Sequence, residues 1–342
     1  MPRFYVVGGR AKGNFGGKEE WRGYERALVL SIDSNTGAAS ELIGWASPPD
    51  ACPDENPSFV FKCGTLVSGR LWVCTQTEVM CYSVPDFHQT HYLSLPFFND
   101  LHHVTPTSRG TLLIAVTGLD MVVEVTNAGD ILREWEAMGQ PLWSRFSRDV
   151  DYRKVPTTKP HVAHPNFVFG VGNEIWTTRC DTMDAVCLMD MGRRMPIEVG
   201  LLHDGHVRGD SVYFTVVTGH VVIYDWRRDR IRESIDLHPI FNAPQGRPLG
   251  WCRGIRILSD DRIVVGFSRI RRTKFRDRLI WVRDRLAALS PVQAAPWYPM
   301  PTRLACVDIR RQAVEWEIDL EKFGMNAVFS IHDSDCPDPI PA

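Results

Sequence analysis

Short apolar and β-branched runs, separated by polar turn residues, recur along the whole chain. Their length and their content of Val, Ile, Tyr and Phe are typical of strands rather than helices. One set of runs comprises Phe4–Gly9, Leu71–Gln76, Thr111–Thr117, Glu174–Arg179, Ser211–Val217 and Arg262–Ser268. A second set follows the first, at Ala27–Asp33, Glu78–Val84, Met121–Asn127, Asp184–Asp190, His220–Trp226 and Arg303–Ile309. The pattern therefore predicts an all-β protein built from a repeated unit.

Two further strands complete each unit. A third strand follows polar turns such as Ser34–Gly37, whose Asn and Gly residues are typical of hairpins. A leading strand begins at each of five polar motifs, Lys62–Gly64, His102–Val104, His164–Asn166, His203–Gly205 and Cys252–Gly254. The N-terminus supplies three strands of a sixth unit, and the C-terminal run Ala327–His332 supplies its missing first strand. We therefore expect a six-bladed β-propeller, residues 1–342 as one domain, closed by pairing the C-terminal strand with the N-terminal blade. A β-sandwich with long loops is the alternative.

These repeats resemble the six-bladed β-propeller superfamily that includes NHL-repeat and gluconolactonase-like proteins. The run Cys252–Arg269, followed by Cys306–Asp308, is similar to a group of uncharacterised bacterial propellers. This resemblance implies the fold and no particular activity.

Composition narrows the class of protein. There are 39 basic and 41 acidic residues, which argues against a nucleic-acid-binding face. No run of about 18 apolar residues occurs, so we expect no membrane partner. The N-terminal sequence lacks the pattern of a signal peptide, and the nine cysteines include no CxxC pair. We therefore expect a cytoplasmic protein with reduced thiols.

The long connections all join strands at one face of the predicted propeller. The largest is an insertion at residues 269–301, in which Arg276–Ser290 has an approximately helical apolar stripe. This helix is either a lid over the channel or an element that packs on the edge of a blade. In the lid interpretation, Trp281, Trp297 and Tyr298 line the substrate pocket.

The leading strands converge on the channel, and their first residues are rich in histidine and cysteine. Aligning the units places Cys63, His103, His164, His203 and Cys252 at equivalent positions, and His332 is a sixth candidate. Neutral imidazoles from different blades suit a transition metal ion such as Fe, Cu or Zn. We therefore expect His103, His164, His203 and His332 as ligands, with Cys63 and Cys252 lining the substrate pocket. Strand alternation predicts that His102 faces away from the channel.

The same residues allow two other functions. In a metal-free enzyme, a histidine would act as nucleophile or acid/base, with Arg253, Asn166 and His206 as the catalytic candidates. That constellation resembles the active-site style of bacterial arylsulfate sulfotransferases, which are six-bladed propellers with a histidine nucleophile. Alternatively, the aligned histidines and cysteines form a hydrogen-bonded plug in the channel, and the protein is a non-enzymatic scaffold for protein or ligand binding. The leading hypothesis is a metal-dependent oxidoreductase, oxygenase or lyase that acts on a small organic metabolite at the channel mouth.

Overall fold

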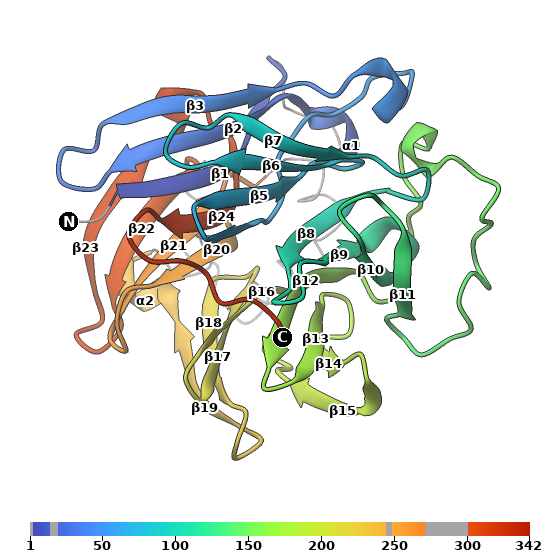
Figure 1. Cartoon of the computed structure of the whole chain (residues 1–342). Helices are drawn as coiled ribbons and strands as arrows, with labels where there is room; N and C mark the ends of the chain where they lie inside the picture. Colours follow the sequence, from blue (N-terminus) through green and yellow to red (C-terminus); the bar gives the residue numbers. More distant parts are fainter. Residues whose placement is uncertain (1–2, 14–19, 244–247, 271–299) are drawn as a thin grey trace, which may run out of the picture.

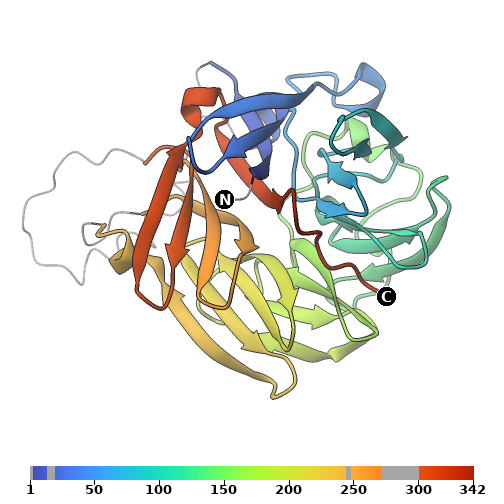
Figure 2. The ribbon, with the colours of Figure 1, turned by 60° about the vertical axis from the view of Figure 1, so that its left-hand side comes forward.

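Six four-stranded antiparallel sheets are arranged as the blades of a propeller around a central channel (Figures 1 and 2). The computed structural model describes residues 3–13, 20–243, 248–270 and 300–342. The predicted six-bladed, all-β fold is confirmed. The lid prediction, with Trp281, Trp297 and Tyr298, lies outside the described residues.

Each blade runs from an inner strand at the channel to an outer strand at the rim. The first three blades are β4 (Thr65–Val67), β5 (Arg70–Cys74), β6 (Val79–Ser83) and β7 (Gln89–Leu93); β8 (Leu101–Pro106), β9 (Leu112–Val116), β10 (Met121–Val125) and β11 (Ile131–Glu136); and β12 (Pro165–Val171), β13 (Glu174–Arg179), β14 (Asp184–Cys187) and β15 (Asp190–Pro196). The next two are β16 (Leu202–Arg208), β17 (Ser211–Val216), β18 (His220–Asp225) and β19 (Arg230–Asp236); and β20 (Trp251–Ile257), β21 (Arg262–Ser268), β22 (Arg303–Asp308) and β23 (Ala313–Asp319).

The sixth blade joins the two ends of the chain. It consists of β24 (Ala327–Asp333), β1 (Arg3–Ala11), β2 (Tyr24–Asp33) and β3 (Ala39–Trp45), with β24 innermost. β24 pairs antiparallel with β1 from Phe4↔Asp333 to Gly9↔Ala327. This pairing confirms the predicted closure of the ring.

Helices are few in the described part of the chain. Two short α-helices, α1 (Glu20–Gly23) and α2 (Leu237–Ile240), lie in connections between strands. Four single turns of 3₁₀-helix occur at Pro49–Ala51, Thr117–Leu119, Tyr152–Lys154 and Glu321–Phe323. None of the described helices is long and apolar enough to cross a membrane.

The core lies between neighbouring blades. Both faces of the middle strands are apolar because each sheet packs against one blade on either side; β9 and β10 are buried along their whole length. One interblade cluster joins Leu113 of β9 to Ile175 of β13, and another joins Phe4 of β1 to Leu304 of β22. The outer strands are polar and largely exposed, as in β19. Blade packing therefore holds the inner strands in place around the channel.

The close contact between β1 and β24 predicts a sensitive glycine. A Cβ atom at Gly8 would overlap the carbonyl oxygen of Ala327. We expect Gly8→Ala to lower the free energy of unfolding by about 2–3 kcal/mol, because the closing pair must separate to make room. Gly13→Ala is the matched control, since a Cβ there meets no atom within 4 Å. Equal urea midpoints for the two variants would contradict the role given to the closing pair.

Candidate functional site

Four inner strands carry an irregularity at the same level. The pairing register shifts between Leu101 and His103 in β8, Pro165 and Val168 in β12, Leu202 and Gly205 in β16, and Cys252 and Ile255 in β20. A bulge of this kind changes the direction of the side chains at the extra residue. The extra residues include His102, Asn166, His203 and Arg253, and all four line one pocket.

This pocket of about 240 Å³ lies at one mouth of the channel. The other residues that line it belong to strand connections or strand ends: Lys159, Pro160, His161, His164, Cys180, Asp181, Leu201, Val217 and Trp251. They lie on the face where the sequence placed the long loops. We call this pocket the loop-side pocket.

The buried carboxylate of Asp120 positions two histidines of the loop-side pocket, His161 and His164. Asp120 accepts hydrogen bonds from the backbone N–H groups of Val162, Ala163 and His164, at 2.8–2.9 Å. It also forms an ion pair with Arg145, at 2.5 Å. These contacts hold His164 at a left-handed φ of 54°, and its Nδ1 lies 3.2 Å from Nδ1 of His161. The ring of His102 lies 5.1 Å from that of His164 and 6.1 Å from that of His203.

His203 is held by the carboxylate that follows it in the sequence. Its Nδ1 lies 3.1 Å from Oδ1 of Asp204, and neither side chain is more than 2% exposed. Asp204 Oδ2 also accepts hydrogen bonds from the Thr215 hydroxyl, at 2.6 Å, and from the Gly254 N–H, at 2.7 Å. A carboxylate can only accept, so it fixes the proton of a neutral His203 on Nδ1.

The other nitrogen of His203, Nε2, is buried and makes no hydrogen bond within the described part of the chain. Burial lowers the pKa of His203 even though Asp204 opposes that shift, so the imidazole is neutral at pH 7. Asp204 itself has a lowered pKa: burial disfavours its ionisation, but His203 and the hydrogen bonds it accepts outweigh this effect. The pair therefore combines an ionised carboxylate with an imidazole whose Nε2 carries a lone pair.

A second acceptor in the loop-side pocket is Asn166. Its Nδ2 donates to the Leu202 carbonyl, at 2.9 Å, which orients the amide. Its Oδ1 is buried and has no hydrogen-bond partner in the described part of the chain. Cationic groups lie nearby, because Arg253 and Lys159 line the same pocket, and the guanidinium of Arg253 lies 4.8 Å from the centre of the Phe329 ring. The carboxylate that lines the pocket belongs to Asp181, whose side chain is 41% exposed.

Cys63, His203 and Asp204 form a buried group that could hold a metal ion, since their ligand atoms lie within 4.8 Å of one another. Sulfur, imidazole nitrogen and carboxylate oxygen together suit zinc, copper or iron. However, the Cys63 thiol lies near the Phe329 carbonyl, at 3.1 Å, and Asp204, at 3.5 Å. Burial and Asp204 also raise its pKa well above the usual value, so an ion would have to displace protons from Cys63 and from Nδ1 of His203.

The structure divides the predicted four-histidine ligand set between the two ends of the channel. His164 and His203 line the loop-side pocket, whereas His103 lines a smaller cavity at the opposite end, which we call the far mouth. Both ring nitrogens of His332 are engaged in hydrogen bonds: Nδ1 lies 2.6 Å from Oδ2 of Asp338, and Nε2 lies 2.9 Å from Oγ of Ser330. The four predicted ligands therefore do not meet at one point. Among the described residues, the single group with metal-site spacing is Cys63, His203 and Asp204.

Other predicted site residues divide in the same way. Of the three catalytic candidates, Arg253 and Asn166 line the loop-side pocket, whereas His206 lines the far mouth. Cys252 is fully buried in an interblade apolar cluster and is absent from the pocket lining. The expectation that His102 faces away was wrong, because the bulge in β8 turns it into the pocket. The places of Lys159 and His161 in the pocket were not predicted from the sequence, since both lie in a connection without strand periodicity.

The comparisons with known proteins give the fold. No protein-family model and no curated protein matches the chain. The chain is similar to a solved protein of unknown function from Bacteroides caccae, with 12% identity and a TM-score of 0.56 over 99% of both chains. It is also similar to a streptogramin B lyase structure, with 14% identity and a TM-score of 0.51, over 97% of this chain and 93% of the other. At these identities the likeness extends to the propeller fold alone.

The buried histidines predict an unusual pH dependence of stability. Burial lowers the pKa values of His103, to about 3, and of His203 and His206. Below the unfolded-state pKa of about 6.5, the unfolded chain binds more protons than the folded one, so stability falls as the pH falls. Each such histidine contributes up to about 1.4 kcal/mol per pH unit. Urea unfolding at several pH values should show this loss beginning near pH 6.5, and constant stability from pH 7.5 to 5 would contradict it.

Proposed function

We propose that the protein is an enzyme in which His203, oriented by Asp204, acts as a general base on a small organic molecule in the loop-side pocket. The observation that carries this proposal is the buried Nε2 of His203, which has no partner among the described residues although Nδ1 lies against an ionised carboxylate. Groups with this arrangement can accept a proton near neutral pH. The proposal keeps the metal-free, histidine-dependent function that the sequence allowed.

The pocket also defines the substrate class. Its volume of about 240 Å³ is below the ~300–1,000 Å³ of pockets that bind drug-sized ligands, so it suits a small metabolite. Asn166 Oδ1 would accept a hydrogen bond from a substrate O–H or N–H group. Arg253 and Lys159 carry N–H donors that would stabilise negative charge on a carbonyl or carboxylate.

The reaction that fits these groups is an elimination. Nε2 of His203 takes a proton from a carbon next to a carbonyl or carboxylate, and Arg253 stabilises the resulting enolate. The electron pair then forms a carbon–carbon double bond, and a leaving group on the neighbouring carbon departs with its bonding pair. A lyase is among the solved structures similar to this chain, which supports the reaction class through the fold alone.

Deuterium incorporation tests the base even while the substrate is unidentified. In D₂O, the protein incubated with a library of small carboxylic acids and their esters should exchange an acidic C–H of a bound compound or eliminate a group from it, both visible by mass spectrometry. His203→Gln should reduce this rate by about 10²–10⁴-fold, because it removes the base and keeps the volume. His220→Gln is the matched control, since His220 of β18 is not among the residues that line the pocket. Undiminished exchange or elimination by His203→Gln would refute the assignment.

A metal-dependent function is a second candidate, supported by the spacing of Cys63, His203 and Asp204. These three side chains would hold a transition metal ion, which would act as a Lewis acid beside the pocket. His203 is essential in both proposals, whereas Cys63 is needed only in the metal-dependent one. Cys63 is therefore the residue that distinguishes them.

Cys63→Ala separates the two proposals. In the metal-free enzyme, this variant and chelator-treated protein keep their turnover, because Asp204 still orients His203. In the metal-dependent enzyme, protein purified without chelators contains about one ion per chain, and Cys63→Ala loses both the ion and the turnover. Elemental analysis and rate measurements on the same samples decide between them. Cys252→Ala is the matched control, as a buried thiol outside the pocket lining.

A further inference from the structure

The end of the chain crosses the far mouth of the channel. Residues 334–342 leave β24 and run across the ring, as the dark red segment in Figures 1 and 2 shows. The Asp338 N–H donates to the Leu66 carbonyl of β4, at 2.7 Å, and the Ser108 N–H donates to the Pro341 carbonyl, at 3.0 Å. Near β12 the segment passes so closely that a Cβ on Gly170 would lie 2.8 Å from Cα of Pro341. The segment is therefore bound to blades other than the one from which it comes.

Asp338 is the centre of these contacts. Its side chain is 6% exposed, and three donors from three different blades converge on its carboxylate. Arg256 Nη1 of β20 lies 2.6 Å from Oδ1, while the Leu66 N–H of β4 and Nδ1 of His332 in β24 lie 2.7 and 2.6 Å from Oδ2. A guanidinium, a backbone amide and an imidazole are the groups with which proteins bind carboxylate ligands.

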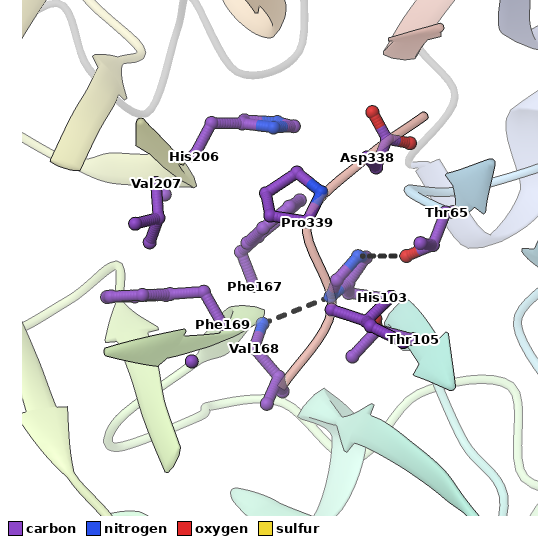
Figure 3. A pocket seen from close by; sticks show the side chains of 14 residues that line it. Thr65, His103, Thr105, Phe167, Val168, Phe169, His206, Val207, Asp338 and Pro339 are labelled. Carbon is purple, nitrogen blue, oxygen red and sulfur yellow. Dashed lines mark hydrogen bonds between the residues drawn. The ribbon is translucent and has the colours of Figure 1, made fainter. Parts of the chain in front are cut away.

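A small cavity lies next to this carboxylate. Figure 3 shows Asp338 and Pro339 beside His103, Phe167 and His206, which all line the cavity of about 20 Å³. The His103 ring stacks on Phe167, with ring centres 3.8 Å apart. His206 is 8% exposed, and its Nε2 has no hydrogen-bond partner among the residues described. The far mouth therefore offers an imidazole nitrogen with no partner among the described residues and about one water's volume beyond the bound carboxylate.

We propose that the far mouth is a second ligand site, specific for carboxylates, and that Asp338 fills it as an intramolecular ligand. Its donors belong to the rigid inner strands, whereas the carboxylate belongs to the terminal segment. Removing the carboxylate leaves Nη1 of the buried Arg256 and the Leu66 N–H without their acceptor, while Nη2 of Arg256 keeps its hydrogen bond to the Cys336 carbonyl. A free carboxylate should therefore bind in place of the Asp338 side chain. This site uses none of the groups assigned to catalysis in the loop-side pocket, so the two proposals stand or fall separately.

Rescue by small carboxylates tests the proposal on the full-length chain. We expect Asp338→Ala to melt at a lower temperature than the parent in chloride. Formate or acetate at equal ionic strength should raise its melting temperature by about 2 °C or more, because the anion binds the folded state. Asp335→Ala is the matched control, since Asp335 is an exposed acid of the same segment. Adding Arg256→Gln to Asp338→Ala should abolish the rise.

A second variant distinguishes a binding site from a general salt effect. Asp338→Asn fills the same space without the charge, so it should melt at a lower temperature than the parent and gain nothing from formate. Equal shifts in the parent, Asp335→Ala and Asp338→Ala, or no shift in Asp338→Ala, would overturn the proposal. Should Asp338→Ala not accumulate as folded protein, its refolding yield from urea gives the same test. A higher yield in formate than in chloride supports the site, and equal yields refute it.

Discussion

Closure of the ring by β1 and β24 is the interaction on which the two ends of the channel depend. Blades packed side by side define a channel with fixed walls only when the last blade meets the first. The closing strand also contributes directly to both ends. Phe329 of β24 lies 5.9 Å from the His203 ring and 4.8 Å from the Arg253 guanidinium, while His332 of the same strand binds Asp338. The strand that closes the fold therefore contacts residues at both ends of the channel.

Bulges in the inner strands give the channel two chemically different ends. In β16 the extra residues place His203 in the loop-side pocket and Asp204 beneath it, where Asp204 accepts hydrogen bonds from Thr215 and Gly254. In β8 the same irregularity directs His102 to the loop-side pocket and His103 to the far mouth. Adjacent residues of one strand thus line opposite ends of the channel. Between these two ends, Asp204 of β16 accepts a hydrogen bond from Gly254 of β20 and so links two neighbouring blades.

The sequence was sufficient to predict the blades, because alternating apolar runs and hairpin turns depend on local patterning. It also predicted the closure, since the N-terminal blade lacked a first strand and Ala327–His332 was left over. The orientation of the channel residues was less predictable. Regular strand alternation predicted that His103 faces the mouth on the long-loop face and that His102 points away from the channel. The bulge in β8 adds one residue, so His102 lines the loop-side pocket and His103 lines the far mouth. The role of Asp338 could not be predicted, because residues 334–342 have no strand or helix period and are held by contacts with distant blades.

The protonation of His203 is the measurement that tests the central claim most directly. Nitrogen-15 NMR of histidine-labelled protein, with His203→Gln used to assign its signals, distinguishes a protonated ring nitrogen from one that carries a lone pair. We predict a neutral His203 at pH 7, with the proton on Nδ1, a lone pair on Nε2 and a pKa lowered by burial. A proton on Nε2 at pH 7, or a His203 that titrates at or above pH 6.5, would contradict the proposed catalytic base.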